Sequence, residues 1–146
     1  MEITNNNYIQ QPIPSTKSGN VSPTSVPKSE KTSLIHDMAK NIDPSNMSRN
    51  DALEIANQLM KSGDGELSTV FLSQAITLKN NGDGTFSQAD ENSPEMTDKF
   101  NMFDRIKSQM AFNDQNNISN ESLQKAFNFL DKLTIAKTQP AIDVYA

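Results

Sequence analysis

Cysteine is absent from this chain of 146 residues, and histidine occurs only once, at His36. Without cysteine the chain forms no disulfide, holds no zinc through thiolates and has no cysteine nucleophile. A single histidine does not allow a chain of imidazole bases. The sequence also contains no glycine-rich phosphate loop, no GxSxG elbow and no HExxH helix. These absences disfavour the common hydrolytic and nucleotide-binding chemistries, so we predict a protein that is not an enzyme and uses no cofactor.

Apolar residues and basic charge are also scarce. Hydrophobic residues make up 34% of the chain, below the roughly 45–50% of globular domains, which indicates that part of the chain has no core. No run approaches the roughly 18 apolar residues of a membrane span, and the N-terminus lacks the basic and apolar regions of a cleaved secretion signal. The net charge of −5 disfavours a nucleic-acid surface. We expect no membrane or nucleic-acid partner, and a cytoplasmic protein or one exported without a cleaved signal peptide.

The two ends of the chain lack the apolar periodicity of folded elements. Residues 1–32 hold four of the seven prolines and many Ser, Thr and Asn residues. Such a segment cannot bury enough surface to offset the entropy that ordering costs, so we predict a disordered tail. Pro140 prevents a preceding helix from continuing, and we predict that residues 139–146 form a flexible C-terminus.

Between these ends, residues 33–138 predict one all-α domain, a small bundle of four to five helices. Apolar residues recur at spacings of three and four, the period of helices that bury one face. After a short first helix, we expect a second helix capped by Ser48, a third capped by Ser68 and a long fourth that begins at Pro94 and continues for about five turns. A last helix follows Ser119. We identify no segment with a clear strand pattern.

The most informative local signals surround the stretch DPSNMS. The side chains of Asp43 and Asn46 can bond nearby backbone amides, and Pro44 fixes the turn between them. Ser48 is a preferred N-cap residue, with an acidic residue three positions later as in a capping box. Gly63, at the end of the same apolar stripe, supplies the left-handed conformation that ends a helix. We interpret these residues as turn and cap positions.

Residues 79–90, KNNGDGTFSQAD, match half of the calcium-binding loop of an EF-hand. Asn81 and Asp83 fall on ligand positions, and Asp90 falls on the last position, which prefers the longer Glu. Lys79 occupies the first position, where calcium requires an oxygen donor and an ammonium would lie close to the ion. We therefore interpret the segment as a turn between two helices. Weak calcium binding by Asn81, Asp83 and Asp90 is the alternative.

A few large apolar residues fall outside the predicted helix stripes and are candidates for a partner-binding surface. They are Met102, Phe112, Phe129 and, near the C-terminus, Tyr145. Phe129 and Phe127 cannot share one face of a helix, because successive helical residues point about 100° apart. Phe129 is therefore either a partner contact or a residue covered by a neighbouring helix, and the sequence leaves both interpretations open.

Residues 42–68, IDPSNMSRNDALEIANQLMKSGDGELS, resemble a segment of small bacterial helical proteins of uncharacterised function that share a D-P-x-N-M-S turn. The later part of the chain, through LQKAFNFLDKL, is similar in layout to the helical pair of that family. The stretch NNGDGTFSQADENS is longer than the family pattern. The resemblance implies a helical fold and a bacterial origin, and it implies no activity.

The composition of residues 1–32 is similar to that of the N-termini of flagellar or type III export substrates and their regulators. Together these features lead us to expect a non-enzymatic bacterial helical module for protein–protein interaction, an adaptor or regulator linked to flagellar or type III export. The alternatives are a weak calcium-binding protein and an exported effector. The sequence identifies neither the protein partner nor the oligomeric state.

Overall fold

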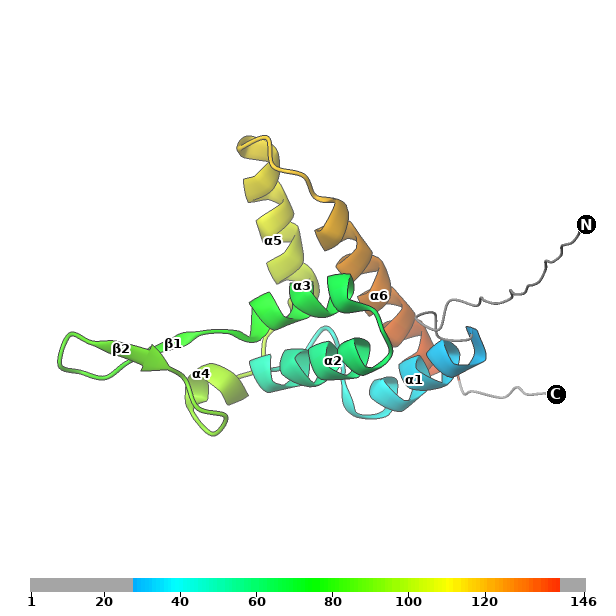
Figure 1. Ribbon diagram of the computed structural model, residues 1–146, viewed down its shortest axis with the longest axis horizontal. Coiled ribbons are helices and arrows are strands. Elements are labelled where there is room, and N and C mark those ends of the chain that lie inside the picture. Colours follow the sequence, from blue (N-terminus) through cyan, green and yellow to red (C-terminus); the bar gives the residue numbers. More distant parts are fainter. Residues whose placement is uncertain (1–27, 140–146) are drawn as a thin grey trace, which may run out of the picture.

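Helices dominate the part of the chain that the computed structural model describes, residues 28–139 (Figure 1). In chain order the elements are α1 (Lys28–Asn41), α2 (Arg49–Lys61), α3 (Gly65–Ala75), β1 (Leu78–Asn80), β2 (Phe86–Gln88), α4 (Pro94–Thr97), α5 (Met102–Gln115) and α6 (Glu121–Thr138). The predicted all-α class is confirmed, because only two strands of three residues each interrupt the helices between residues 28 and 139. None of these helices combines the length and hydropathy of a membrane-spanning segment.

The predicted domain boundaries are only partly covered by the described residues. Most of the predicted tail, residues 1–27, lies outside them, and α1 begins inside the predicted tail at Lys28. At the other end, α6 stops at Thr138, where we expected the helical domain to end. Residues 140–146 of the predicted flexible C-terminus lie outside the described residues, and Tyr145 with them.

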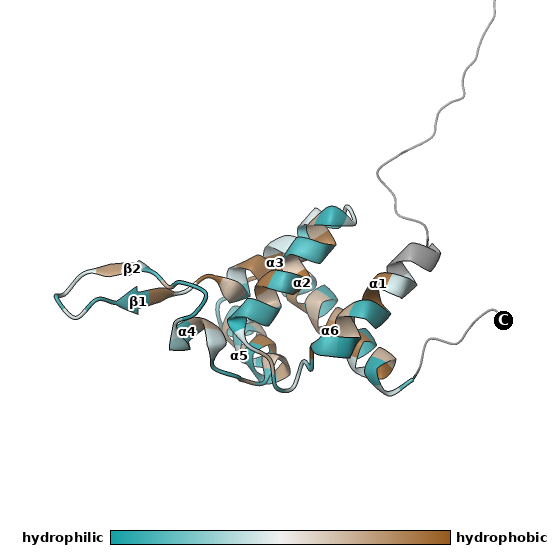
Figure 2. Ribbon diagram, turned by 90° about the horizontal axis from the view of Figure 1, so that it is seen from below, coloured by the Kyte–Doolittle hydropathy of each residue, from teal (hydrophilic) through white to brown (hydrophobic). Residues whose placement is uncertain are grey.

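One apolar core joins the helices. In Figure 1, α2 and α3 lie side by side, and α6 runs from α1 past α3 to the far end of its pair with α5. Each long helix in Figure 2 carries both apolar and polar residues, as expected of helices that bury one face. The buried apolar residues are Met38, Ala39, Ile42, Met47, Ala52, Ile55, Ala56, Leu59, Leu67, Phe71, Ala75, Met102, Ile106, Leu123, Ala126, Phe129, Leu130 and Leu133.

The start of α2 follows the prediction closely. The Ser48 hydroxyl accepts a hydrogen bond from the Asp51 amide at 3.1 Å, and the Asp51 carboxylate accepts one from the Ser48 amide at 2.8 Å. This reciprocal pair is a capping box. Gly63, just after the helix, has a φ of 90°, the left-handed conformation expected of a residue that ends a helix.

The prediction for the start of α3 is wrong. The helix begins at Gly65, and its N-cap is Asp64, whose carboxylate accepts a hydrogen bond from the Leu67 amide at 3.2 Å. Ser68 lies one turn inside the helix and is buried. Its hydroxyl donates a 2.7 Å hydrogen bond to the carbonyl of Ala56, which ties α3 to α2. The small residue that resembled a cap is therefore a contact between two helices.

The long fourth helix that we predicted is divided in two. It begins at Pro94 as predicted, but α4 ends at Thr97, and α5 starts only at Met102. In the gap, the backbone of Phe100 pairs with that of Met47 through hydrogen bonds of 2.8 and 2.9 Å. The side chain of Asn101 then caps α5. The apolar spacing continued through this gap because Met96 is buried on α4 and Phe100 packs against the core from the segment that follows.

The last helix also starts slightly later than expected. It begins at Glu121, with Asn120 in the N-cap position and no side-chain cap bond. Ser119, the predicted cap, still contributes, because its hydroxyl accepts a hydrogen bond from the Glu121 amide at 3.2 Å. Asn117, in the same connection, adopts a left-handed φ of 57°, which Asn tolerates better than most residues.

Residues 78–88 form a β-hairpin where we predicted no strand. Leu78 pairs with Gln88 and Asn80 with Phe86 in an antiparallel register. Gly82 and Gly84 have φ values of 87° and 90°, which the tight turn requires and which glycine adopts at little cost. The hairpin projects from the helices (Figure 1), and its apolar Leu78 and Phe86 are 60% and 62% exposed.

Candidate functional site

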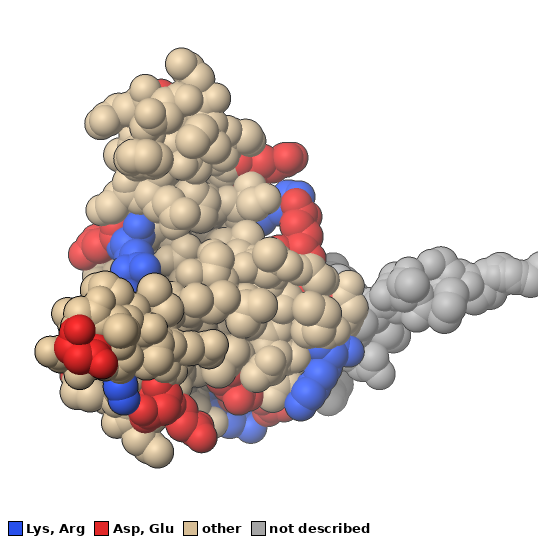
Figure 3. Space-filling model, turned by 60° about the vertical axis from the view of Figure 1, so that its left-hand side comes forward, with Lys and Arg blue, Asp and Glu red and all other residues tan. Residues whose placement is uncertain are grey.

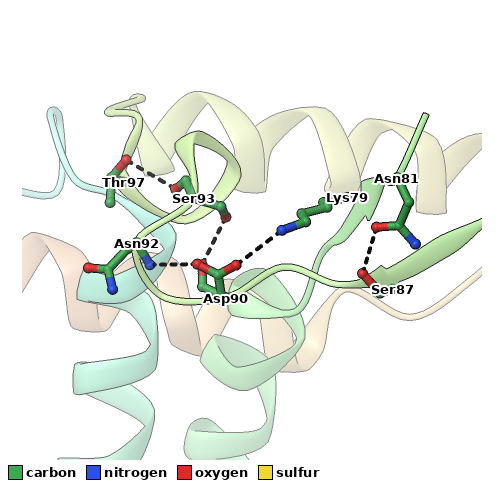
Figure 4. A network of polar contacts seen from close by, with 7 residues as sticks. All are labelled: Lys79, Asn81, Ser87, Asp90, Asn92, Ser93 and Thr97. Carbon is green, nitrogen blue, oxygen red and sulfur yellow. Dashed lines mark hydrogen bonds and ion pairs between the residues drawn. The ribbon is translucent and has the colours of Figure 1, made fainter.

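The predicted calcium loop is this hairpin, and its geometry does not assemble a metal site. The Asp83 carboxylate accepts hydrogen bonds from the amide and hydroxyl of Thr85, and these bonds lower the pKa of Asp83. The Asn81 side-chain oxygen accepts a hydrogen bond from the Ser87 hydroxyl at 3.0 Å (Figure 4). Both side chains are thereby engaged within the turn itself. Among residues 28–139, no group of three or more His, Cys, Asp or Glu side chains could hold a metal ion.

Asp90, the third predicted ligand, lies at the base of the hairpin and not at its turn. Its carboxylate is paired with the Lys79 ammonium at 3.2 Å, which lowers the pKa of Asp90. The Asn92 amide donates to the other carboxylate oxygen, and Ser93 donates to the Asp90 carbonyl, so Asp90 joins the hairpin to the start of α4 (Figure 4). Lys79, which does not fit the first position of the EF-hand pattern, is thus the ion-pair partner of Asp90, which occupies the last position.

Two of the four predicted partner-binding residues belong to the core. Met102 is fully buried at the start of α5, and Phe129 is only 7% exposed, with its ring edge-on to Phe71 at 5.6 Å. Phe127 points to another neighbour, Phe103, at 5.1 Å. Because α6 has helices on more than one side, both aromatic residues find a partner within the chain. The prediction of an exposed contact is therefore wrong for Met102, and of the two interpretations of Phe129 the structure shows the second, a residue covered by a neighbouring helix.

Phe112 is placed as predicted. It is 59% exposed on α5, near the end of the α5–α6 pair, where Ile118 is also 50% exposed. On the face that Figure 3 shows, this end, at the top of the view, carries few charged residues. An exposed aromatic ring in a surface of low charge is typical of a contact that a partner covers.

Phe112 also lines an open groove between the C-terminal half of α3 and α5. The groove has a volume of about 900 Å³. The lining residues are Ser73, Gln74, Phe100, Asn101, Asp104, Arg105, Ser108, Gln109 and Phe112. On α5, Arg105, Ser108, Gln109 and Phe112 follow the spacing of a single helix face.

The turn and cap residues hold one side of this groove in place. The Asp43 carboxylate accepts hydrogen bonds from the Ser45 amide and hydroxyl, and the Asn46 amide closes the turn on the Asp43 carbonyl at 2.9 Å. Asn46 thus acts through its backbone, where we had expected its side chain. The carbonyl of Pro44 accepts a 2.9 Å hydrogen bond from the Met102 amide. Together with the pairing of Met47 and Phe100, this bond fixes the segment that carries Phe100 into the groove.

Two arginines meet at Gln74, a buried residue near the end of α3. Arg49 donates from Nη1 to the Gln74 carbonyl at 2.6 Å, and Arg105 donates from Nε to the Gln74 side-chain oxygen at 2.7 Å. The side-chain nitrogen of Gln74 donates in turn to Gln109 at 2.9 Å. Gln74 itself is 3% exposed, so these bonds are partly shielded from water, and they join α2, α3 and α5.

Both guanidinium groups also lie over the ring of Phe100. The distances to the ring centroid are 5.8 Å for Arg49 and 5.6 Å for Arg105, within the range of cation–π attraction. Burial, and then the neighbouring charge of Arg105, lower the pKa of Arg49. No carboxylate of the described residues forms an ion pair with either guanidinium. The groove therefore combines the positive charge of Arg105, a second positive charge on Arg49 close behind it, a fixed polar floor and an exposed aromatic rim.

Sequence reasoning missed both arginines. They are the only arginines in the chain, against eleven lysines among its thirteen basic residues. That scarcity is a signal, since arginine differs from lysine in its planar group, which stacks on rings and binds carboxylates through two hydrogen bonds. It does not reveal that the two residues meet.

Comparisons of the chain with protein-family models, curated proteins and solved structures find no match.

Proposed function

We propose that this protein is a non-enzymatic helical module for protein–protein interaction, which acts as an adaptor or regulator and binds a partner polypeptide in the groove between α3 and α5. The observation that carries this proposal is Phe112, an aromatic residue 59% exposed at the end of a groove with a fixed floor. Aromatic anchors beside such hollows supply much of the binding energy of protein interfaces.

The hydrogen bonds around Gln74 favour this use of the groove. Arg105 and Gln109 are already held by the Gln74 side chain, so they lose little conformational freedom when a partner binds. The volume of about 900 Å³ suits a short stretch of polypeptide. A partner that covers Phe112 also removes an apolar ring from water, a gain of about 1.5–3 kcal/mol for complete burial.

The test is photocrosslinking in bacterial cells with a benzophenone amino acid at position 112, compared with the same probe at position 135. Ile135 is 52% exposed on α6 and does not line the groove, so it is a matched control. We expect a discrete crosslinked partner from position 112 that is absent from position 135. Pull-down with the Phe112→Ser variant should lose the same partner, while Ile135→Ser keeps it. Equal recovery by both variants would contradict the proposal.

We further propose a bacterial protein linked to flagellar or type III export, which rests on the composition of residues 1–32 and on the DPSNMS resemblance. A secretion assay of the full chain against a variant without residues 2–27 tests this link, because that deletion leaves α1 whole. If the deletion leaves secretion unchanged, or if the full chain is not secreted, the proposed link to export is wrong. Either result leaves the proposal of a partner-binding groove unaffected.

A further inference from the structure

We infer that the groove recognises an acidic peptide segment, in which a carboxylate binds Arg105 and an apolar side chain three residues away covers Phe112. This inference rests on the proposed function and names the chemistry of the partner. It concerns a specific pair of contacts, one polar and one apolar, on a single face of α5.

The charge of the site is the first argument. The chain carries a net charge of −5, yet its only two arginines converge on one aromatic ring. Every described ion pair involves a lysine, so neither guanidinium group is in an ion pair within residues 28–139. Two like charges held close together cost free energy, and an anion that joins them recovers it.

Arg105 also has unused hydrogen-bond donors. A guanidinium has five N–H donors. Arg105 uses Nε for Gln74, and its two Nη groups have no hydrogen-bond partner among the described residues. An end-on carboxylate fits that pair of groups with two parallel, charge-assisted hydrogen bonds. Arg49 does not line the groove itself, so its part is to hold Gln74 and Phe100 and to add a second positive charge.

The spacing of Arg105 and Phe112 along α5 also fits a short peptide. Arg105 and Phe112 line the same groove two helical turns apart, a rise of about 10 Å along α5. A peptide in the polyproline II conformation advances about 3.1 Å per residue with three residues per turn, so an acidic and an apolar residue separated by two others project from the same side and lie about 9 Å apart. The inferred motif is therefore acidic-x-x-apolar in a polyproline II segment.

Asp104 supplies a test of sign. It lines the groove beside Arg105 and is in no described ion pair, so its carboxylate repels an incoming anion. The Asp104→Asn variant should therefore bind an acidic peptide more tightly.

The experiment uses the full-length ¹⁵N-labelled protein and two capped peptides, acetyl-Gly-Glu-Ser-Ser-Phe-Gly-amide and its Gln analogue. Titrations are followed by NMR in 50 mM salt, where the Nε–H signals of the only two arginines report directly on the site. We expect the acidic peptide to shift these signals and to bind roughly tenfold more tightly than the Gln analogue. Higher salt should reduce the difference.

Variants separate this inference from the proposed function. Arg105→Gln should abolish the preference for Glu over Gln, and Arg105→Lys should restore only part of it. Lys107→Gln should retain the full preference. This variant removes one positive charge from the same helix, but Lys107 lies over Phe127 and not in the groove. The backbone spectrum of each variant shows whether it is folded.

Equal affinity for the two peptides, no binding by either at millimolar concentration, or a preference that survives Arg105→Gln would overturn the carboxylate inference. Loss of the crosslinked partner in Phe112→Ser, measured separately, would still support the interaction module. If Phe112→Ser keeps its partner while the preference for the Glu peptide holds, the groove binds acidic peptides but the crosslinked partner binds at another surface.

Discussion

Replacement of Phe129 by Ala should destabilise the protein strongly, because this ring belongs to the core. Phe129 is 7% exposed and lies edge-on to Phe71 at a centroid distance of 5.6 Å. Truncation of a buried Phe to Ala typically costs about 3–5 kcal/mol, through lost burial and the cavity that remains. About 0.5–1.5 kcal/mol of that cost is expected from the lost aromatic pair.

Phe112→Ala is the matched control, since it removes the same atoms from a side chain that is 59% exposed. It should change the free energy of unfolding by no more than about 0.5 kcal/mol. Urea denaturation followed by circular dichroism at 25 °C measures both variants. If Phe129→Ala is too unstable to fold, Phe129→Leu keeps most of the volume and should cost about 1–2 kcal/mol. A loss below about 1 kcal/mol in Phe129→Ala would refute the assignment of this ring to the core.

Three further changes test local features. Gly63→Ala should lower the free energy of unfolding by about 1–2 kcal/mol in urea, because its φ of 90° is unfavourable for a residue with a Cβ atom. Burial raises the pKa of Asp51, but hydrogen bonds from Ser48 and Lys99 outweigh it and the net pKa is lowered. The ionised Asp51 carboxylate therefore stabilises the folded protein fully above the unfolded pKa near 4, and this stabilisation is lost as the pH falls through the lower folded pKa. Urea midpoints measured between pH 2 and 7 should show this loss in the unaltered protein, and the contribution of Asp51 to it should be absent in Asp51→Asn. Calorimetric titration with millimolar Ca²⁺ should give the same result for the unaltered protein and for Asp83→Ala, with no saturable binding heat in either. A saturable heat that is present in the unaltered protein and lost in Asp83→Ala would support the calcium alternative.

Features that depend on neighbours in the sequence were predictable. The capping box of Ser48 and the left-handed Gly63 are both found, because each depends on a few consecutive residues. The hairpin had a local signal too, since Asn-Gly and Asp-Gly steps between residues 81 and 84 are typical of hairpin turns. It was missed because strands of three residues are too short to show an alternating pattern.

Features that depend on distant contacts were not predictable. The helix expected after Pro94 breaks where Phe100 pairs with Met47, and no local pattern encodes that partner. Ser68 is a suitable cap by residue type and is instead bonded to Ala56 in another helix. Arg49 and Arg105 come from α2 and α5 and meet only because α3 places Gln74 between them.

The pairing of Met47 with Phe100 joins the DPSNMS turn to the segment that carries Phe100 into the groove. Phe100 lies in the groove, while Met47 directly precedes the capping box of α2, and two backbone hydrogen bonds join them. By thermodynamic linkage, a ligand that steadies Phe100 would also steady the turn, and a substitution that loosens the turn would weaken binding only by the part of its effect that this coupling carries. Natural variation at Asp43 or Pro44 would then tune affinity without altering any residue that a partner touches.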